Sequence, residues 1–289
     1  MSLITKKAVL ITGCSDGGLG SALASAFLSE SYHVFATTRN VSKMSTLSKL
    51  PNVTLLDLDV TVDSQITAAV ESVKKITGHL DILINNAGRN HFSPVLDIDI
   101  SEAKQIFEIN LWGPLALIKA FMPLLMESKG IVVNTTSISG YLNVPYMGLY
   151  AATKRSLELV AETLRLEIEP FGVKAVQLVT GAVKSNGQTY FEDWKLPEDS
   201  LYKPIEALIA HRVRGGDGHP REETEKYAKD VVDDILSGKT GKVWRGGNAT
   251  STKRAMTSDV PQSLLDKGAS KDTGLDQLVA NKELNTVVK

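Results

Sequence analysis

A phenol and an ammonium group are the first side chains in this sequence whose spacing could do chemistry. Tyr150 and Lys154 stand four residues apart, and on a helix that spacing makes two side chains neighbours on one face. A lysine beside a tyrosine favours the phenolate and lowers the tyrosine pKa from about 10, as general acid–base catalysis requires. With seven tyrosines in the chain, such a pair arises by chance at roughly even odds, so other residues must support it.

Two polar residues that precede this pair give that support. Ser137 lies thirteen residues before Tyr150, just past the apolar run 131–134, where its hydroxyl could hydrogen-bond a carbonyl oxygen that Tyr150 protonates. Asn110, in the helical stretch 105–117, could hold a water against Lys154. Taken singly, Ser137 is more often a turn residue and Asn110 a surface amide or a helix kink. Their shared order along the chain favours the catalytic interpretation.

A glycine-rich loop, Thr12-Gly-Cys-Ser-Asp-Gly-Gly-Leu-Gly20, lies between an apolar run at 8–11 and a helical pattern that starts at Leu19. Backbone amides and the positive end of a helix bind a pyrophosphate at such a place, and glycine allows the close approach. The alternative is an ordinary tight turn, but the position between strand and helix favours a nucleotide site.

Arg39 follows the second predicted strand, where a NAD-binding protein normally places an acidic residue to grip the ribose hydroxyls. Its cation favours a 2′-phosphate, so we expect NADPH as the cofactor. An arginine here could also be a solvated surface residue, and Asp16 in the glycine loop argues against a phosphate. We expect no metal.

The elements that must position these residues follow from the hydrophobic pattern. Short apolar runs alternate with segments of helical periodicity, the runs being 8–11, 33–37, 54–58, 82–84, 131–134 and 175–179. Strands that are apolar on both faces belong in a parallel sheet with right-handed helical crossovers. The sequence therefore predicts an α/β fold, a single Rossmann-type domain over residues 1–250 with a doubly wound parallel sheet and helices on both faces. The loops after its strands should converge on one site.

The rest of the chain has a less regular pattern. Residues 186–218 are predicted to form a mobile cover over the substrate and to include a helix near 205–213. A helix at 222–236 and a strand at 242–245 are predicted to follow. The polar tail, residues 251–289, is expected to be loosely ordered or to pack on a partner.

Composition excludes several classes of protein. The 289 residues carry a formal net charge of −1 and no long basic run, so nucleic acid is not an expected partner. The single cysteine, Cys14, cannot form an intramolecular disulfide, and no signal-peptide pattern precedes the first strand. No uninterrupted apolar run approaches the ~20 residues of a membrane-spanning helix. We therefore expect a soluble, cytoplasmic protein without a transmembrane segment.

Taken together, the motifs resemble the short-chain dehydrogenase/reductase family over roughly the first 250 residues. The family's cofactor loop matches Thr12, Gly13, Gly18 and Gly20, its adenine contact matches Asp59, its strand-four signature matches Asn85-Asn-Ala-Gly88, and its catalytic four match Asn110, Ser137, Tyr150 and Lys154. The resemblance implies these cofactor contacts: Gly13, Ser15, Gly18, Leu19, Gly20, Arg39, Asp59, Val60, Asn86, Ala87, Gly88, Tyr150, Lys154, Val183 and Ser185.

The sequence departs from the family pattern at two places. The glycine loop has one residue more than the usual spacing, a form that resembles the subgroup of fungal acyl-dihydroxyacetone-phosphate reductases and 17β-hydroxysteroid dehydrogenase-like proteins. Thr180-Gly181 stands where the family commonly has Pro-Gly, ahead of Val183, whose backbone the resemblance places at the nicotinamide carboxamide. Without the proline this loop is expected to be looser, but no catalytic group is lost.

The resemblance implies an NADPH-dependent carbonyl reductase. Hydride passes from the nicotinamide to the carbonyl carbon while Tyr150 donates a proton to the oxygen, which Ser137 also holds. Lys154 binds the nicotinamide ribose, lowers the pKa of Tyr150 and, with Asn110 and water, connects to a proton supply.

The substrate is left open between several classes. Aromatic residues cluster in 91–92, 141–150 and 190–194, which indicates a bulky, largely apolar ketone, although about half of them could simply pack the core. The subgroup points to acyl-dihydroxyacetone phosphate or a steroid, whereas the polar C-terminal segment favours a secondary-metabolite ketone. A cofactor-binding protein without turnover and an epimerase or dehydratase are the other interpretations. The helices at 102–126 and 150–169 resemble those that pair in family dimers, so we expect a homodimer or homotetramer.

Overall fold

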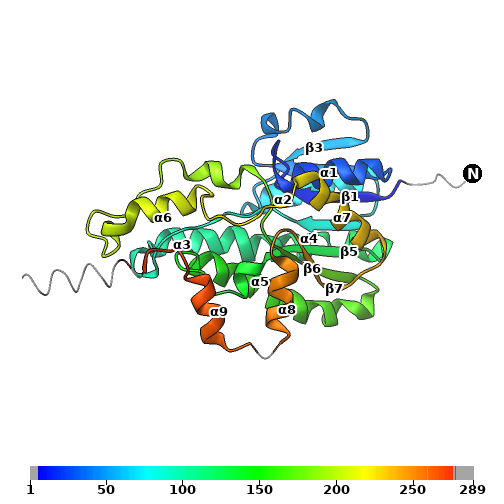
Figure 1. The fold of residues 1–289 in the computed structure, drawn as a ribbon. Helices are drawn as coiled ribbons and strands as arrows, with labels where there is room; N and C mark the ends of the chain where they lie inside the picture. The colour runs from blue at the N-terminus through cyan, green and yellow to red at the C-terminus, as the bar shows by residue number, and fades with distance from the viewer. Residues whose placement is uncertain (1–5, 259, 276, 278–289) are drawn as a thin grey trace, which may run out of the picture.

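Seven parallel strands form the centre of the fold (Figure 1). The computed structural model describes residues 6–258, 260–275 and 277. The strands are β1 Ala8–Thr12, β2 His33–Thr38, β3 Val53–Asp57, β4 Ile82–Asn85, β5 Ile131–Ser137, β6 Lys174–Thr180 and β7 Gly241–Arg245. Their order in the sheet is β3-β2-β1-β4-β5-β6-β7, and each neighbouring pair is parallel. The predicted doubly wound parallel sheet is confirmed.

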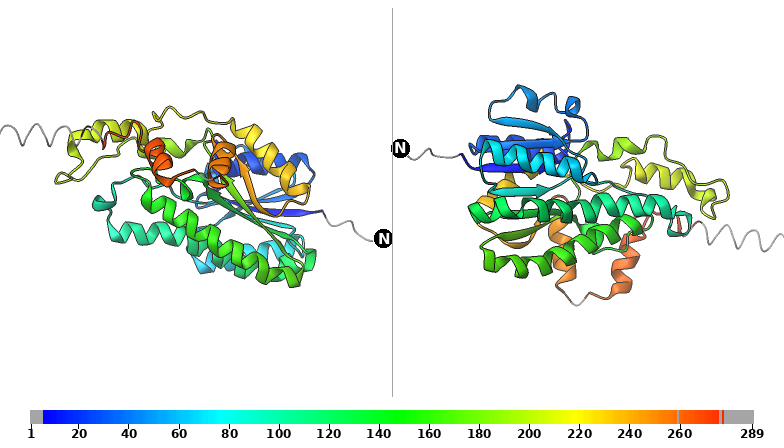
Figure 2. Two further views of the ribbon diagram at one scale, coloured as in Figure 1. Left: turned by 60° about the horizontal axis from the view of Figure 1, so that its bottom comes forward. Right: turned by 180° about the vertical axis from the view of Figure 1, so that it is seen from behind.

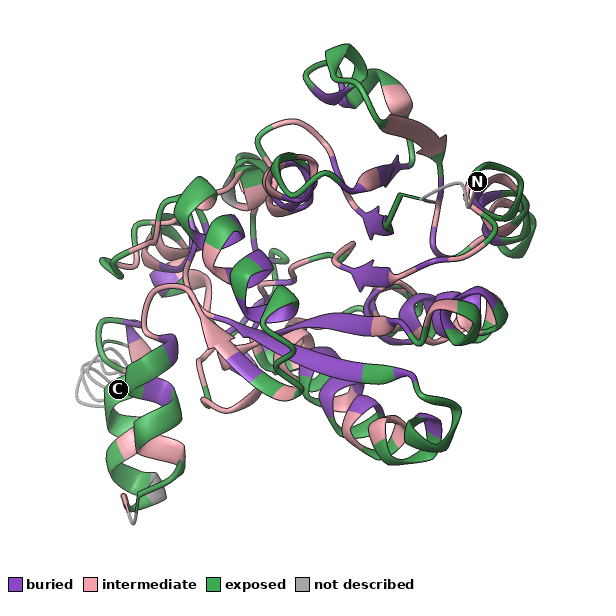
Figure 3. Cartoon of the chain, turned by 90° about the vertical axis from the view of Figure 1, so that its right-hand side faces the viewer, coloured by how far each residue is buried: buried purple, intermediate pink, exposed green. Residues whose placement is uncertain are grey.

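Two helical layers cover the sheet (Figure 2). The helices α1 Leu19–Ser29 and α7 Thr224–Leu236 lie on one face, and α2 Asp63–Ile76, α4 Gly113–Ser128 and α5 Gly148–Ile168 lie on the other. Because strand side chains alternate between faces, Val9 and Ile11 of β1 pack with the first layer, whereas Ala8 and Leu10 pack with the second. Every residue of β1 is therefore buried (Figure 3).

The carboxyl ends of the strands meet at one edge of the sheet. Thr12, Thr38, Asn85, Ser137 and Thr180 are the last residues of their strands, as the predicted convergence of the following loops requires. Most observed strands extend beyond the predicted runs by one to three residues, although β3 ends one residue earlier than its predicted run. Ser137 therefore belongs to β5 and does not lie past it. Strand ends carry polar residues, which the apolar pattern does not mark.

The short elements between these strands and helices shape the site. Helix α3 Ile100–Phe107 continues into α4 through a π-helical turn, η4 Glu108–Trp112. The remaining turns are 3-10 helices: η1 Val41–Lys43, η2 Leu47–Lys49, η3 Val95–Asp97, η5 Ile138–Gly140, η6 Glu169–Phe171, η7 Asn186–Phe191 and η8 Lys203–Ile205. Within the cover segment 186–218, helix α6 Glu206–Val213 confirms the helix predicted near 205–213.

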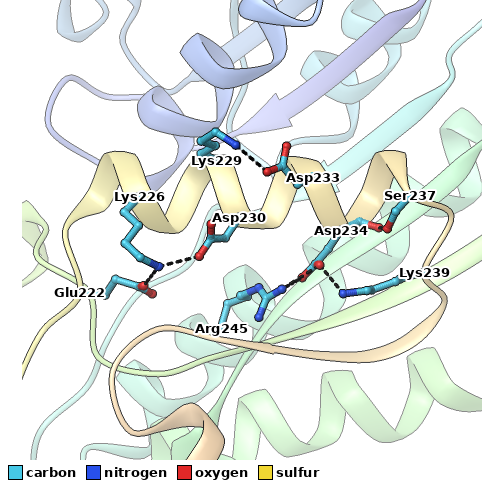
Figure 4. Close-up of polar contacts among 9 residues, drawn as sticks. All are labelled: Glu222, Lys226, Lys229, Asp230, Asp233, Asp234, Ser237, Lys239 and Arg245. Atoms are coloured by element: carbon cyan, nitrogen blue, oxygen red, sulfur yellow. Dashed lines mark hydrogen bonds and ion pairs between the residues drawn. The ribbon is translucent and has the colours of Figure 1, made fainter.

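Helix α7 holds β7 through a buried carboxylate (Figure 4). Asp234 of α7 is 5% exposed and forms an ion pair of 2.7 Å with Arg245, the last residue of β7. Lys239 donates a second bond to the same carboxylate. The backbone oxygen of Arg245 in turn accepts the amide of Gly181 at 2.8 Å. The ion pair therefore stabilises the loop that follows β6 at the edge where the strands end.

The tail differs from the prediction of a loosely ordered segment. It contains helices α8 Ala249–Met256 and α9 Gln262–Ala269, and α8 crosses the expected boundary at residue 250. Asn143 donates a hydrogen bond of 2.8 Å to Asp266, and Tyr146 one of 2.8 Å to the backbone oxygen of Thr273. Over its described residues, the tail packs on its own chain. Short helices with few apolar residues leave a weak periodic pattern, which is why the sequence did not reveal them.

One helical stretch also differs from the expectation about membrane segments. Residues 100–128, through α3, η4 and α4, are by length and composition long and apolar enough to cross a membrane. Polar residues within the stretch interrupt its apolar runs, so the search for uninterrupted runs missed it. Half of its apolar window is buried inside the fold, where Leu117, Phe121 and Leu125 pack in the same cluster as α2 and β4. This is the packing of a core helix.

Candidate active site

Tyr150, Lys154 and Ser137 meet beyond the end of β5. Tyr150 and Lys154 lie in the first two turns of α5, and Ser137 ends β5. The Tyr150 and Ser137 side chains are hydrogen-bonded to each other. The Lys154 Nζ lies 5.9 Å from the centre of the Tyr150 ring and donates a hydrogen bond of 2.8 Å to the backbone oxygen of Thr135. The structure thus brings together three of the four residues expected to be catalytic.

The electrostatics of the tyrosine differ from the prediction. Burial raises the pKa of Tyr150 to about 12, although the hydrogen bond with Ser137 partly opposes the rise. Burial lowers the pKa of Lys154 to about 8. The expected lowering of the tyrosine pKa by Lys154 is therefore wrong for the protein alone, because loss of hydration on burial outweighs the lowering by the hydrogen bond with Ser137. A phenol with this pKa keeps its proton at neutral pH.

Asn110, the fourth expected residue, sits in the π-helical turn. Its Oδ1 accepts the backbone amide of Arg89 at 2.8 Å, and its Nδ2 donates to the Arg89 oxygen at 2.9 Å and to the Thr153 hydroxyl at 3.0 Å. Such turns occur mostly as single interruptions of an α-helix and often mark functional sites. The Asn110 side chain clamps the loop after β4 to α5, next to Lys154. A water between Asn110 and Lys154 stays a prediction.

Two hydroxyl groups that the sequence analysis did not single out, those of Ser139 and Thr153, complete this arrangement. Ser139 donates from its hydroxyl to the Ser137 oxygen at 2.9 Å, and Thr153 bonds Asn110. The Thr12 hydroxyl accepts the amides of Asn86 and Ala87 at 3.0 and 2.9 Å. Thr153 lies between Tyr150 and Lys154 in the sequence, so its position was available as a signal. The bond from Lys154 to a backbone oxygen left no trace in the sequence.

The glycine loop fits a pyrophosphate. Helix α1 begins after Gly18 with no side-chain cap, so its first-turn amides are available to an anion. A Cβ at Gly20 would lie 2.4 Å from the backbone oxygen of Gly13, and Gly13 has a φ of +77°. Asn86 fixes the loop by donating to the Thr12 oxygen at 2.8 Å. A groove of about 540 Å³ runs from Gly18 outwards between α1 and α7, and none of the four residues expected to be catalytic lines it.

Arg39 and Asp16 lie where the second strand ends. Arg39 is exposed, and its guanidinium forms no hydrogen bond or ion pair with any residue that the structure describes. The Asp16 carboxylate accepts the Ser45 amide and hydroxyl at 2.8 and 2.7 Å and the Thr46 amide at 3.2 Å. Despite some desolvation, these hydrogen bonds hold its pKa below the ordinary value. Asp16 thus stabilises the segment at Ser45 and Thr46. Because its carboxylate is engaged there, it is a weaker argument against a phosphate beside Arg39.

The remaining expected cofactor residues lie at the same edge of the sheet. Ser15 is hydrogen-bonded to the Thr38 hydroxyl at 3.1 Å. One oxygen of Asp59 accepts from the amide and hydroxyl of Thr61, and Val60 is buried. A Cβ on Gly88 would lie 3.2 Å from the Lys154 Nζ. Val183 is buried and bridges to Glu222, and Ser185 caps η7.

The loop after β6 is held without the proline. The Thr180 hydroxyl forms a hydrogen bond of 2.7 Å with the hydroxyl of Tyr227, which is fully buried in α7. Gly181 and Ala182 donate backbone bonds of 2.8 Å to Arg245 and Gly247. These bonds hold the loop in the structure, and whether it is looser than a loop with proline stays a prediction.

The aromatic segments expected to line a substrate pocket divide into two groups. Phe92, Phe191 and Trp194 pack on a small cluster over the cover segment, where the Phe92 and Phe191 rings meet at 5.1 Å. Tyr141 instead packs on Trp244 at 4.8 Å and donates a hydrogen bond to the buried Glu158. Tyr141 therefore packs within the protein, in agreement with the alternative that some of these aromatic residues do not line a substrate pocket.

Comparison with known proteins agrees with this geometry. A family model described as short chain dehydrogenase matches residues 7–196. A curated short-chain dehydrogenase of Penicillium ochrochloron, ptmH, is 45% identical over 246 residues, which cover 85% of this chain and 90% of that protein. An NADPH-dependent 1-acyldihydroxyacetone phosphate reductase of Schizosaccharomyces pombe is 38% identical over 209 residues, 71% of this chain and 70% of that one.

Solved structures show the same fold. A short-chain dehydrogenase from Streptomyces avermitilis superimposes with a TM-score of 0.76 at 25% identity and covers 97% of this chain and 99% of its own. A short chain dehydrogenase from Burkholderia cenocepacia in complex with NADP has a TM-score of 0.72 at 25% identity. The match covers 89% of this chain and 94% of that one.

Proposed function

Because the chain belongs to the short-chain dehydrogenase/reductase family, whose members are oxidoreductases, we propose that it is an NADPH-dependent carbonyl reductase with Tyr150 as its proton donor. The observation that carries this proposal is the meeting of Tyr150, Ser137 and Lys154 at the edge of the sheet where the glycine loop also lies. With Asn110 present as well, a cofactor-binding protein without turnover is the weaker alternative.

The residues of the site supply the proton chemistry. Tyr150 holds its proton at neutral pH, because burial raises its pKa to about 12, and it donates this proton to the carbonyl oxygen as negative charge develops there. Ser137 donates a second hydrogen bond to that oxygen, and Ser139 orients Ser137. Lys154 donates a hydrogen bond to the Thr135 oxygen, which places its ammonium group beside the phenol of Tyr150. Asn110 lies next to it and joins the loop after β4 to α5. The nicotinamide cofactor supplies the hydride when bound.

The cofactor proposal depends on the glycine loop and on Arg39. The amides at the start of α1, with Gly13, Gly18 and Gly20 around them, would hold the pyrophosphate. Arg39 has no described partner and would pair with a 2′-phosphate, which makes NADPH the proposed cofactor. The other contacts proposed above, including Asp59, Asn86 and Val183, lie along the same edge of the sheet.

We propose a bulky, largely apolar ketone as substrate. The aromatic residues Phe92, Phe191 and Trp194 support this, because they pack on an apolar cluster that includes Tyr146, four residues before Tyr150. A secondary-metabolite ketone is the first choice, and an acyl-dihydroxyacetone phosphate or a steroid is the alternative, supported by the relative at 38% identity. The cytoplasm is the compartment we expect, since the chain holds a single cysteine.

The test is oxidation of NADPH and NADH by the purified protein against steroids, polycyclic aromatic ketones and acyl-dihydroxyacetone phosphate. We expect turnover with NADPH on one of these classes. In the variant Arg39→Ala, the Kd for NADPH should rise roughly 10- to 100-fold, as expected for the loss of a charge-assisted bond worth about 1.5–3 kcal/mol, while the Kd for NADH stays the same. Equal loss for both cofactors would contradict the role of Arg39, and tight NADPH binding with no turnover on any ketone would favour the non-catalytic alternative.

A further inference from the structure

The C-terminal segment 260–275, here called the strap, lies against the elements around the site. It contains α9 and ends beside α6 (Figures 1 and 2). Thr273, near its end, is fully buried, and Leu275 packs on the apolar cluster of the cover segment. A tail that merely trailed from the fold would bury neither residue.

Tyr146 is the residue on which the strap converges. Its hydroxyl donates a hydrogen bond of 2.8 Å to the backbone oxygen of Thr273, and its backbone oxygen accepts the amide of Ser93 at 2.8 Å. Its ring lies 6.3 Å from that of Tyr202 in the cover, edge to face. One residue therefore connects four segments: its side chain contacts the strap and the cover, and its backbone joins the loop after β4 to the loop that leads to Tyr150.

The backbone of Tyr146 is held in an unfavourable conformation. Its φ is +70°, and it is the only aromatic residue among the described residues with a positive φ. A bulky side chain in this region is a genuine outlier that persists only when its surroundings over-determine it. Helix α5 begins at Gly148, two residues later, and Tyr150 lies in its first turn. The contacts that hold Tyr146 thus also fix where the catalytic helix starts.

The strap also holds the cover from its other side. Arg212 of α6 donates to the backbone oxygen of Asp272 at 3.3 Å. Gly274 has a φ of +84°, and a Cβ there would lie 3.3 Å from the side-chain ends of Ile205 and Leu208. The cover is tied to the loop after β4 as well, because the Trp194 Nε1 donates to the Phe92 oxygen at 2.7 Å.

We propose that the strap is a specificity-determining element, which fixes the cover 186–218 and the loop 138–147 against each other over Tyr150, with Tyr146 as its positioning residue. This rests on the proposed function, since it takes Tyr150 as the reacting group. A fixed cover keeps its apolar side chains in place. These side chains would increase the affinity for bulky apolar ketones, which are large enough to contact them, but not the affinity for small ketones. With the strap released, the cover opens and that preference is lost.

The strap provides a matched pair of variants for the test. Gly274→Ala places a Cβ against the cover at a positive φ, whereas Gly268→Ala places one in open space within α9. Tyr146→Phe keeps the ring and removes the hydroxyl that reaches Thr273. In hydrogen exchange by mass spectrometry, Gly274→Ala and Tyr146→Phe should exchange about tenfold faster in residues 191–213 and 141–147, with β1 and β4 unchanged. Gly268→Ala should match the parent protein.

Unchanged exchange in the cover of both Gly274→Ala and Tyr146→Phe would overturn the proposal, and so would equal acceleration in β1 and β4, which indicates a general loss of stability. On ketones that the parent protein reduces, the ratio of kcat/KM for a bulky ketone to that for butanedione should fall at least about fivefold, through KM for the bulky ketone. A constant ratio despite faster exchange would overturn the specificity role. The exchange measurement needs no turnover, so its result stands apart from any failure of the reductase proposal.

Discussion

At the scale of residues, the site combines a tyrosine that holds its proton with a lysine that loses its proton easily. Burial acts on both groups and disfavours the charged form of each, raising the pKa of Tyr150 to about 12 and lowering that of Lys154 to about 8. A proton donor for ketone reduction benefits from the first effect. The second makes the charged form of Lys154 unfavourable in the folded protein.

Lys154 should therefore make the stability of the protein depend on pH. Its pKa is about 8 when folded against an ordinary 10.5, so between these values the unfolded chain binds more protons and stability rises with pH. Below pH 8 Lys154 is charged in the folded protein, and its burial lowers the free energy of unfolding by the full amount. Relative to Lys154→Met, the parent protein should gain about 3 kcal/mol between pH 7 and pH 10.5. Urea unfolding of both proteins at each pH measures this, and parallel pH curves would contradict a charged, buried Lys154.

Residue types and order were enough to nominate Tyr150, Lys154, Ser137 and Asn110 as candidates, because each would carry its chemistry in its side chain. The sequence could not show that Lys154 donates to the backbone oxygen of Thr135, since a carbonyl group is present at every position. It also gave the wrong direction for the tyrosine pKa, because proximity can be read from spacing but the extent of burial cannot.

At the scale of elements, the junction between β1 and α1 is the most constrained. A Cβ at Gly20 would meet the backbone oxygen of Gly13 at 2.4 Å and the Asn86 amide at 2.8 Å, so the loop would have to move. We expect Gly20→Ala to raise the Kd for NADPH at least about tenfold, as measured by cofactor fluorescence. Ser25→Ala, on the exposed side of the same helix, is the control. Equal Kd values for both variants would place the pyrophosphate elsewhere.

The central strands, such as β1 and β4, were predictable from sequence because they are buried on both faces, which makes the apolar run itself the signal. Polar strand ends such as Ser137 were missed for the same reason. The π-helical turn at Glu108–Trp112 and the helices of the tail were not predictable. A π turn is one extra residue in a helix, and short amphipathic helices need tertiary contacts, such as the bond between Tyr146 and Thr273, to form.

At the scale of the whole molecule, α5 and the stretch before and through α4 keep large apolar side chains exposed. Leu159 and Leu166 of α5 are 65% and 58% exposed, and Trp112 and Met126 are 52% and 42% exposed. Apolar surface of this extent on two helices fits an interface with a second copy of the chain.

Light scattering at micromolar concentration should therefore give a dimer or tetramer. The double variant Leu159→Glu with Leu166→Glu should be monomeric, because two charges would lose hydration in the interface. Ile76→Glu, at the end of α2 and 48% exposed, is the control and should leave assembly unchanged. A monomeric parent protein would contradict the expected assembly.

The role of Tyr150 is tested most directly by Tyr150→Phe, which removes the phenol proton and keeps the ring. Rates of NADPH oxidation with a reducible ketone and the Kd for NADPH should be measured side by side for the variant and the parent protein. The account predicts a loss of turnover of about 10²- to 10⁴-fold, the usual contribution of a positioned acid, with the Kd within about threefold, since the phosphate-binding residues are untouched. Near-normal turnover in the variant would contradict the assignment of Tyr150 as proton donor.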